Sequence, residues 1–91
     1  MPMARIDIKE MRNIQKKIIR MLKNKRKYGG THTETIHLKH CVPKYLRGEK
    51  VVEEAIHDLF QKGILINKKS TGKYHCSLDS SKLREIEKYI D

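Results

Sequence analysis

The stretch VVEEAIHDLFQKGILI, residues 51–66, decides the fold. Its apolar residues recur at helical spacing as far as Phe60, and Gly63 stands where a left-handed residue would end a helix. Three apolar residues follow at once and predict the start of a strand. We therefore predict a helix over about residues 49–62 that leads directly into a strand. The outward positions of this helix are Lys50, Glu53, Glu54, His57 and Gln61.

A β-hairpin is predicted downstream of that helix. Residues 64–68 and residues 73–78 flank a short segment that contains Gly72, as two paired strands around a turn do. Alternation with period two places three residues on one face: Tyr74, Cys76 and Leu78. We expect Tyr74 to pack in the core or in the hairpin itself. The tip of the hairpin is cationic, with Lys68, Lys69 and Lys73.

Upstream, residues 8–22 predict an amphipathic first helix that Asp7 can cap. Its apolar residues fall within an arc of about 160° at 100° per residue. They are Ile8, Met11, Ile14, Ile18, Ile19, Met21 and Leu22. The opposite side carries a basic stripe, made of Lys9, Arg12, Lys16, Arg20 and Lys23. Three further cations extend the stripe along the chain: Lys25, Arg26 and Lys27.

Between these two helices the pattern predicts a turn, a very short strand and a second helix. Gly29-Gly30 marks the turn, and residues 31–33 can form the strand. Thr33 or Thr35 can cap the second helix. Its inward residues are Ile36, Leu38 and Cys41.

The end of the second helix stays open at this point. Pro43 disfavours helical backbone at the residue before it. The helix either ends there or resumes through Tyr45 and Leu46, before Gly48 breaks the chain.

Length and composition bound the kind of protein. With 91 residues, we expect a single domain over residues 1–91, with a flexible N-terminus over residues 1–7. The longest apolar run, residues 64–66, is far short of the ~20 residues that cross a bilayer, and the chain does not begin with an apolar secretion signal. Two cysteines are too few for a disulfide framework. These features predict a cytoplasmic protein without a membrane partner.

The positive charge is large and unevenly distributed. The formal net charge is +10, and residues 1–30 hold ten Lys and Arg against Asp7 and Glu10, for +8. Such a field attracts polyanions, and nucleic acid is the obvious one. The alternative is that the lysines form a solvated face without a binding role.

The predicted order is helix, short strand, helix, helix and hairpin, a mainly α arrangement with a small β-hairpin (α+β). Over residues 8–78 this order resembles the winged helix-turn-helix domain, and residues 51–66 are similar to its recognition helix and the strand after it. The segments KYGGTHT and LRG also resemble short winged-helix proteins of archaea. The resemblance implies DNA binding, most often in transcriptional regulation. Winged helices also bind RNA and protein, so fold alone does not fix the function.

The resemblance implies a third helix in the major groove and a hairpin, the wing, on the phosphate backbone. Arg47 is then the expected specific contact, because arginine pairs with guanine through two hydrogen bonds. Glu53 and Glu54 argue against this docking, since they repel phosphate. The candidate residues on this side are Lys44, Arg47, Lys50, His57, Lys68, Lys69 and Lys73.

A second candidate surface lies on the first helix, where the basic stripe is densest. Its candidate residues are Arg12, Lys16 and Arg20. If they dominate binding, the docking differs from the usual winged-helix geometry. The sequence leaves both surfaces open.

The sequence predicts neither a metal site nor a catalytic site. His37, His40 and Cys41 could supply zinc ligands with His75 and Cys76, if the hairpin lay against the second helix. No Cys-x-x-Cys pair is present, and Cys76 alternates with apolar neighbours as a buried residue does, so we expect no metal and no cofactor. No nucleophile, base and orienting group can be assembled, and no P-loop is present, so we do not expect an enzyme.

We therefore predict a protein that binds double-stranded DNA and acts as a transcriptional regulator or similar factor. One alternative partner is structured RNA, because RGEKVVEEAIHDLFQKGILI is also similar to part of a small-subunit ribosomal winged-helix protein. Another is a protein that docks on the acidic, mixed face of the third helix.

A last helix is predicted over residues 80–91, with Asp79, Ser80 or Ser81 as its cap. Its apolar residues align at helical spacing: Leu83, Ile86 and Ile90. Ile86 and Ile90 need cover, as do whichever of Ile14, Ile19 and Met21 the core leaves exposed. Pairing of the first and last helices across a twofold axis would supply this cover and form a homodimer. The alternative is that the last helix closes the core of a monomer.

Overall fold

The computed structural model describes residues 7–28, 32–70 and 72–90, with residues 68–70 described by their backbone alone. The predicted flexible segment before Asp7, the Gly29-Gly30 turn and the first residue of the predicted short strand, Thr31, lie outside the described residues.

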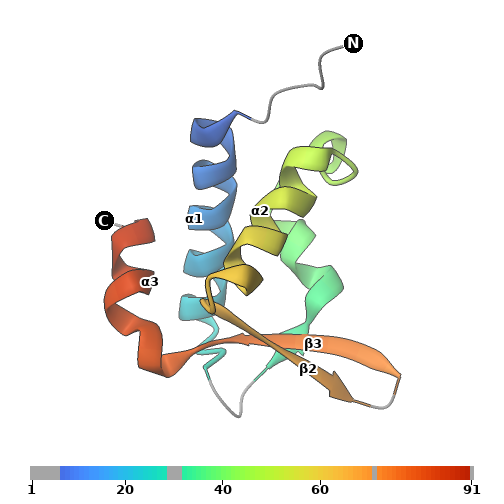
Figure 1. Cartoon of the computed structure of the whole chain (residues 1–91). Helices are drawn as coiled ribbons and strands as arrows, with labels where there is room; N and C mark the ends of the chain where they lie inside the picture. The colour runs from blue at the N-terminus through green and yellow to red at the C-terminus, as the bar shows by residue number, and fades with distance from the viewer. Residues whose placement is uncertain (1–6, 29–31, 71, 91) are drawn as a thin grey trace.

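The chain forms an α+β fold in which helices predominate, as predicted. Its helices and strands are, in order, α1 (Ile8–Asn24), β1 (Thr33–Glu34), the 3-10 helices η1 (Thr35–Cys41) and η2 (Lys44–Leu46), α2 (Lys50–Gln61), β2 (Leu65–Ser70), β3 (Lys73–Leu78), the 3-10 helix η3 (Ser80–Lys82) and α3 (Leu83–Ile90). The strands form one antiparallel sheet with the order β1-β3-β2. In Figure 1, α1 stands between α3 and α2, and the sheet crosses below them.

Helix α1 forms where the sequence predicts it. The Asp7 carboxylate accepts hydrogen bonds from the backbone N–H of Lys9 at 2.9 Å and of Glu10 at 3.4 Å, which caps the first turn. The middle of the apolar arc is buried, at Ile14, Ile18, Ile19 and Leu22. Ile8 is the exception, with 71% of its surface exposed.

The second predicted helix is present at the expected place, but it is wound as the 3-10 helix η1. The prediction that Thr33 or Thr35 caps it is wrong, because Glu34 occupies the cap position and makes no side-chain cap hydrogen bond. The helix ends at Cys41, and Val42 before Pro43 is extended, as the proline requires. The question that the pattern left open is thereby answered, since η2 is a separate turn.

The short strand lies later in the chain than predicted. Thr33 and Glu34 form β1, opposite Cys76 and His75 of β3. The sheet therefore has three strands, and the hairpin is covered along one edge by a segment that precedes η1.

The turn from α2 into β2 follows the predicted geometry. Gly63 has a φ of +73°, in the left-handed region where glycine is favoured. Its N–H donates to the Phe60 carbonyl at 3.1 Å, and the N–H of Ile64 donates to the Leu59 carbonyl at 3.0 Å. These two bonds form a Schellman cap, which ends α2 and directs the chain into the sheet.

Strand β3 enters the core only partway along its length. Cys76 and Leu78 are buried as predicted, and burial raises the pKa of the Cys76 thiol, so the thiol stays protonated at neutral pH. Tyr74 is 58% exposed, so it does not lie in the core, which was one of the two places expected for it. The burial along β3 begins after the first three residues, because the hairpin extends beyond the helices that cover the rest of the sheet (Figure 1).

The last helix closes the core of a single chain. Asp79 caps η3 by accepting from the backbone N–H of Ser81 at 2.9 Å, and α3 then packs on α1 with Ile86 buried. Ile14 and Ile19 of α1 are also buried within the chain. The apolar residues on which the dimer prediction depended are therefore largely covered without a second copy. Within the described residues, no helix is long and apolar enough to span a bilayer.

Candidate nucleic-acid interface

Helix α2 presents the outward row that the sequence predicts. Val52, Ala55 and Leu59 are buried against the core. The opposite side carries Lys50, Glu53, His57 and Gln61, all exposed, with Glu54 half-buried beside them. This row alternates in charge and has no excess of cations.

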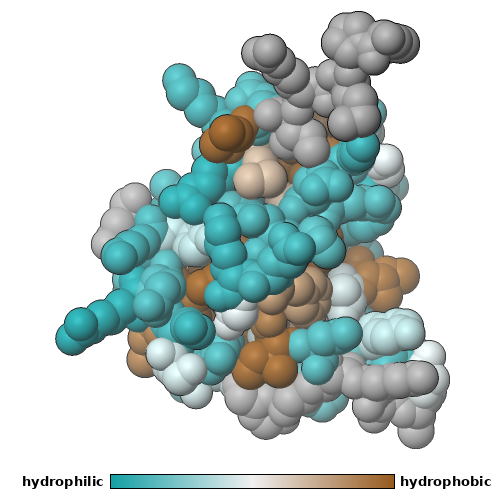
Figure 2. Space-filling view, in the orientation of Figure 1, coloured by the Kyte–Doolittle hydropathy of each residue, from teal (hydrophilic) through white to brown (hydrophobic). Residues whose placement is uncertain are grey.

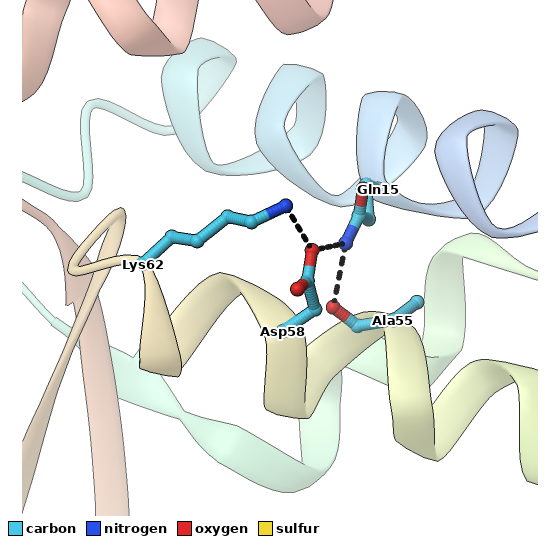
Figure 3. A network of polar contacts seen from close by, with 4 residues as sticks. All are labelled: Gln15, Ala55, Asp58 and Lys62. Carbon is cyan, nitrogen blue, oxygen red and sulfur yellow. Dashed lines mark hydrogen bonds and ion pairs between the residues drawn. The ribbon is translucent and has the colours of Figure 1, made fainter. Parts of the chain in front are cut away.

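A buried amide fixes α2 against α1, as Figure 3 shows. Gln15 is fully buried, and its Nε2 donates to the Ala55 carbonyl and to the Asp58 carboxylate, each at 3.0 Å. Both partners are acceptors, so the nitrogen of the amide must face α2. The other amide atom, Oε1, has no hydrogen-bond partner within the part of the chain that the structure describes.

The same network holds Asp58 in its ionised form. Burial alone would raise the pKa of Asp58. The hydrogen bonds from Gln15 and Lys62, with the positive charges of Lys62 and Arg12, outweigh burial and hold the pKa below its usual value. Asp58 is therefore a fixed negative charge between α1 and α2 at neutral pH.

Arg47, which the sequence predicts as the specific base contact, holds backbone carbonyls in this structure. Its Nε donates to the carbonyls of Lys39 at 3.0 Å and of Val42 at 3.2 Å, and Nη2 lies 3.5 Å from the His40 carbonyl. These carbonyls lie at the end of η1 and just after it, and the Lys39 carbonyl also accepts from the Val42 N–H at 3.2 Å. The guanidinium therefore stabilises the connection between η1 and α2, and the contact of Arg47 with a base stays a prediction.

Three lysines around α2 and the hairpin have counterions. Lys39 pairs with Glu53 at 3.4 Å, Lys62 with Asp58 at 3.0 Å, and Lys73 with Glu34 at 3.5 Å. We name the charged residues of β1, η1, η2, α2, their connections and the hairpin, other than the Lys62–Asp58 pair, the helix–hairpin surface. Its described side chains are Lys39, Lys44, Arg47, Lys50 and Lys73 against Glu34, Glu49, Glu53 and Glu54, a net charge of +1.

Four further cations were predicted on this side of the molecule. Lys44 and Lys50 are exposed. Lys68 and Lys69 lie opposite His75 and Tyr74 in the sheet register, but their side chains are outside the described part.

An apolar hollow interrupts the helix–hairpin surface. It has a volume of about 500 Å³ between η1 and α2, and its apolar walls are Ile36, Ile56 and Phe60. Ile36 is 66% exposed and also borders a second hollow of about 400 Å³ beside Tyr74. Figure 2 shows apolar surface breaking through the hydrophilic one near the C-terminal end of α2 and the sheet. A phosphate backbone gains no favourable contact with an apolar surface.

Two of the predicted first-helix residues, Arg12 and Arg20, contact α3. The guanidinium carbon of Arg12 lies 4.3 Å from the centre of the Tyr89 ring, and Nη2 of Arg20 lies 3.5 Å from the Ile90 carbonyl. Lys16 is half-buried. Lys23, also on the predicted stripe, forms a 2.9 Å ion pair with Glu87. Helix α3 therefore covers one edge of the stripe.

The open part of α1 lies beside that edge, and Arg20 stands at the border between them. We name it the first-helix surface, and its residues are Lys9, Asn13, Lys16, Lys17, Arg20 and Asn24. They fall within an arc of about 100° on the helix, and the arc contains no acidic residue. Lys17 is absent from the predicted site, although its place beside Arg20 and Asn24 on the same helical wheel was the available signal.

The histidines and cysteines do not come together as the zinc site that was considered from the sequence. His37 and His40 stack with ring centres 5.2 Å apart, while His75 pairs with His32 through their Nδ1 atoms at 2.9 Å. One of those two nitrogens must carry the proton and the other accept it. Within residues 7–28, 32–70 and 72–90, no group of three or more His, Cys, Asp or Glu side chains is arranged to hold a metal ion.

Comparisons of the chain with protein-family models, with curated proteins and with solved structures found no match. The charges, contacts and exposure of its residues are therefore the observations that bear on the candidate interface.

Proposed function

We propose that the protein is a winged helix-turn-helix protein that binds double-stranded DNA and acts in transcription or another DNA-associated process. The order of the elements supports the class, since β1 precedes η1 and α2, which pack on α1, and the β2–β3 hairpin follows them and forms one antiparallel sheet with β1. This class would place α2 beside the DNA as its recognition helix and the β2–β3 hairpin as its wing.

The observation that carries the DNA proposal is the net charge of +10 together with a face of α1 that bears four cations and no acid. Cations that neutralise phosphates release the counterions condensed on the duplex, and this release supplies most of the affinity that is independent of sequence. The chain has few aromatic side chains, and they do not form a stacking platform for single strands.

The salt dependence of binding tests the proposal. With about five phosphate contacts, a plot of log K against log salt for a mixed-sequence duplex should have a slope of about −4 to −5. Fluorescence anisotropy of a labelled duplex between 50 and 300 mM salt, conditions on the order of those where such slopes are measured, gives this value. Affinity that does not change with salt contradicts the proposal, and tighter binding to an RNA duplex transfers the function to RNA.

A protein-interaction module is the second candidate, and the hollow between η1 and α2 favours it. Exposed apolar residues bordered by charged ones are typical of protein-binding patches. In that case the positive charge keeps the domain soluble, and the duplex titration should show no binding at physiological salt.

A further inference from the structure

The first-helix surface is free of internal counterions. No described acidic side chain pairs with Lys9, Lys16 or Lys17. Three lysines on the other side of the molecule have Glu or Asp partners, at Lys39, Lys62 and Lys73. A lysine that already holds a carboxylate must lose it before it binds phosphate, so its net contribution to binding a polyanion is small.

The first-helix surface also differs from the helix–hairpin surface in net charge. Lys9, Lys16, Lys17 and Arg20 give +4, with no acidic residue among them. The described side chains of the helix–hairpin surface give +1, a count that does not include Lys68 and Lys69, whose side chains lie outside the described part.

The dimensions of α1 suit a duplex backbone. Seventeen residues give an α-helix about 25 Å long at 1.5 Å per residue. A duplex carries one phosphate charge per about 1.7 Å of its axis, so about 15 phosphates lie along that length. The four cations of the first-helix surface can each find a phosphate among those on the near side, and Asn13 and Asn24 add neutral donors between them.

The first-helix surface and α2 point in different directions. Gln15, which contacts α2, lies about 150° around α1 from the middle of the first-helix surface. A straight duplex that lies along this surface therefore leaves α2 on the far side of α1.

We infer that double-stranded DNA docks on the first-helix surface through its phosphates, and that α2 and the hairpin do not enter the grooves in this complex. This inference rests on the proposed function and specifies its site. It also explains why an apolar hollow and four glutamates can occupy the side that a winged helix would turn towards DNA.

Two matched triple variants test the site. Lys9→Ala, Lys17→Ala and Arg20→Ala together remove three exposed charges from the first-helix surface. The control, Lys44→Ala, Lys50→Ala and Lys73→Ala, removes three from the helix–hairpin surface, so both proteins lose the same net charge. Both variants and the wild type are titrated into the same mixed-sequence duplex, and thermal unfolding of each verifies the fold.

The first variant should lose three contacts. Its slope of log K against log salt should be shallower by about 2.7, and its affinity at 0.15 M salt should fall on the order of a hundredfold. The control should keep most of the wild-type slope. A third variant, Lys9→Arg, Lys17→Arg and Arg20→Lys, should bind like the wild type because it keeps the charges.

Two outcomes overturn the inference. The first is a loss in the control that equals or exceeds the loss in the first variant, which leaves the proposed function intact but moves its site. The second is the absence of duplex binding by the wild type, which removes the proposed function together with its site.

Discussion

Asp58 shows how one carboxylate links two helices. It accepts from Gln15 of α1 and pairs with Lys62 near the end of its own helix (Figure 3). Because its pKa is lowered in the folded protein, the native state binds fewer protons than the unfolded chain at acidic pH. The stability from the ionised group is complete above the unfolded pKa of about 4, and it is lost as the pH falls through the folded pKa.

Replacement of Asp58 by asparagine should therefore change stability and its pH dependence together. We expect Asp58→Asn to lower the free energy of unfolding by about 1–2 kcal/mol at pH 7, because charged hydrogen bonds become neutral ones. The difference from wild type should shrink as the pH falls from 5 to about 2. Urea unfolding at several pH values measures both, with Glu85→Gln on the exposed side of α3 as the control for charge. A difference that stays constant with pH would contradict the linkage.

Single residues were the hardest part to predict from sequence. Gln15 is a polar residue inside an apolar arc, which indicates burial but not its partner, since the partner lies 43 positions away at Asp58. Arg47 precedes the third helix whether it contacts a base or caps η1, and the sequence pattern is the same in both cases. Only the positions of three carbonyl groups distinguish the two roles.

At the scale of the elements, the cap that ends α2 decides how the helix meets the sheet. Gly63→Ala should destabilise the protein by about 1 kcal/mol, because an added Cβ at a φ of +73° is strained. The space itself is available, since the nearest atom to that Cβ would be Lys82 Cε at 3.6 Å. Gly48→Ala is the matched control, as its φ is not positive and no atom lies within 4 Å. Equal unfolding midpoints in urea for the two variants would show that the φ of Gly63 carries no cost.

Elements with a full period of apolar residues were predictable, and short ones were not. α1 and α2 each bury a long face, so periodicity fixes their positions within one or two residues. β1 has two residues and η1 has seven, and neither is long enough to show its period. The register of β1 comes from pairing with β3, which the local pattern does not contain.

At the scale of the whole molecule, the burial of Ile14, Ile19 and Ile86 favours a monomer in the absence of nucleic acid. Light scattering after gel filtration should give a mass near 10.8 kDa at concentrations on the order of 100 μM, where an obligate dimer would stay associated. A mass near two chains would contradict this expectation. Loss of that dimer on Ile90→Lys would then assign the interface to the exposed part of α3.

The sequence shows the charge imbalance, but it does not show which cations pair with other side chains in the folded protein. Counting charges places most of the excess in residues 1–30. It does not show that α3 takes up Arg12 and Lys23, or that lysines such as Lys39 and Lys73 find glutamates. These pairings depend on side chains from distant segments, and they change which cations remain for a partner.

The amide of Gln15 has a consequence for the whole outward row of α2. Aliphatic side chains in the core can adjust to a small rotation of a helix about its axis, because their contacts are not directional. Hydrogen bonds to Ala55 and Asp58 are directional, and a shift of α2 by one residue, about 100°, would break both. The rotation of α2 about its own axis is thus fixed by Gln15 of α1, and so is the set of α2 side chains that face outward.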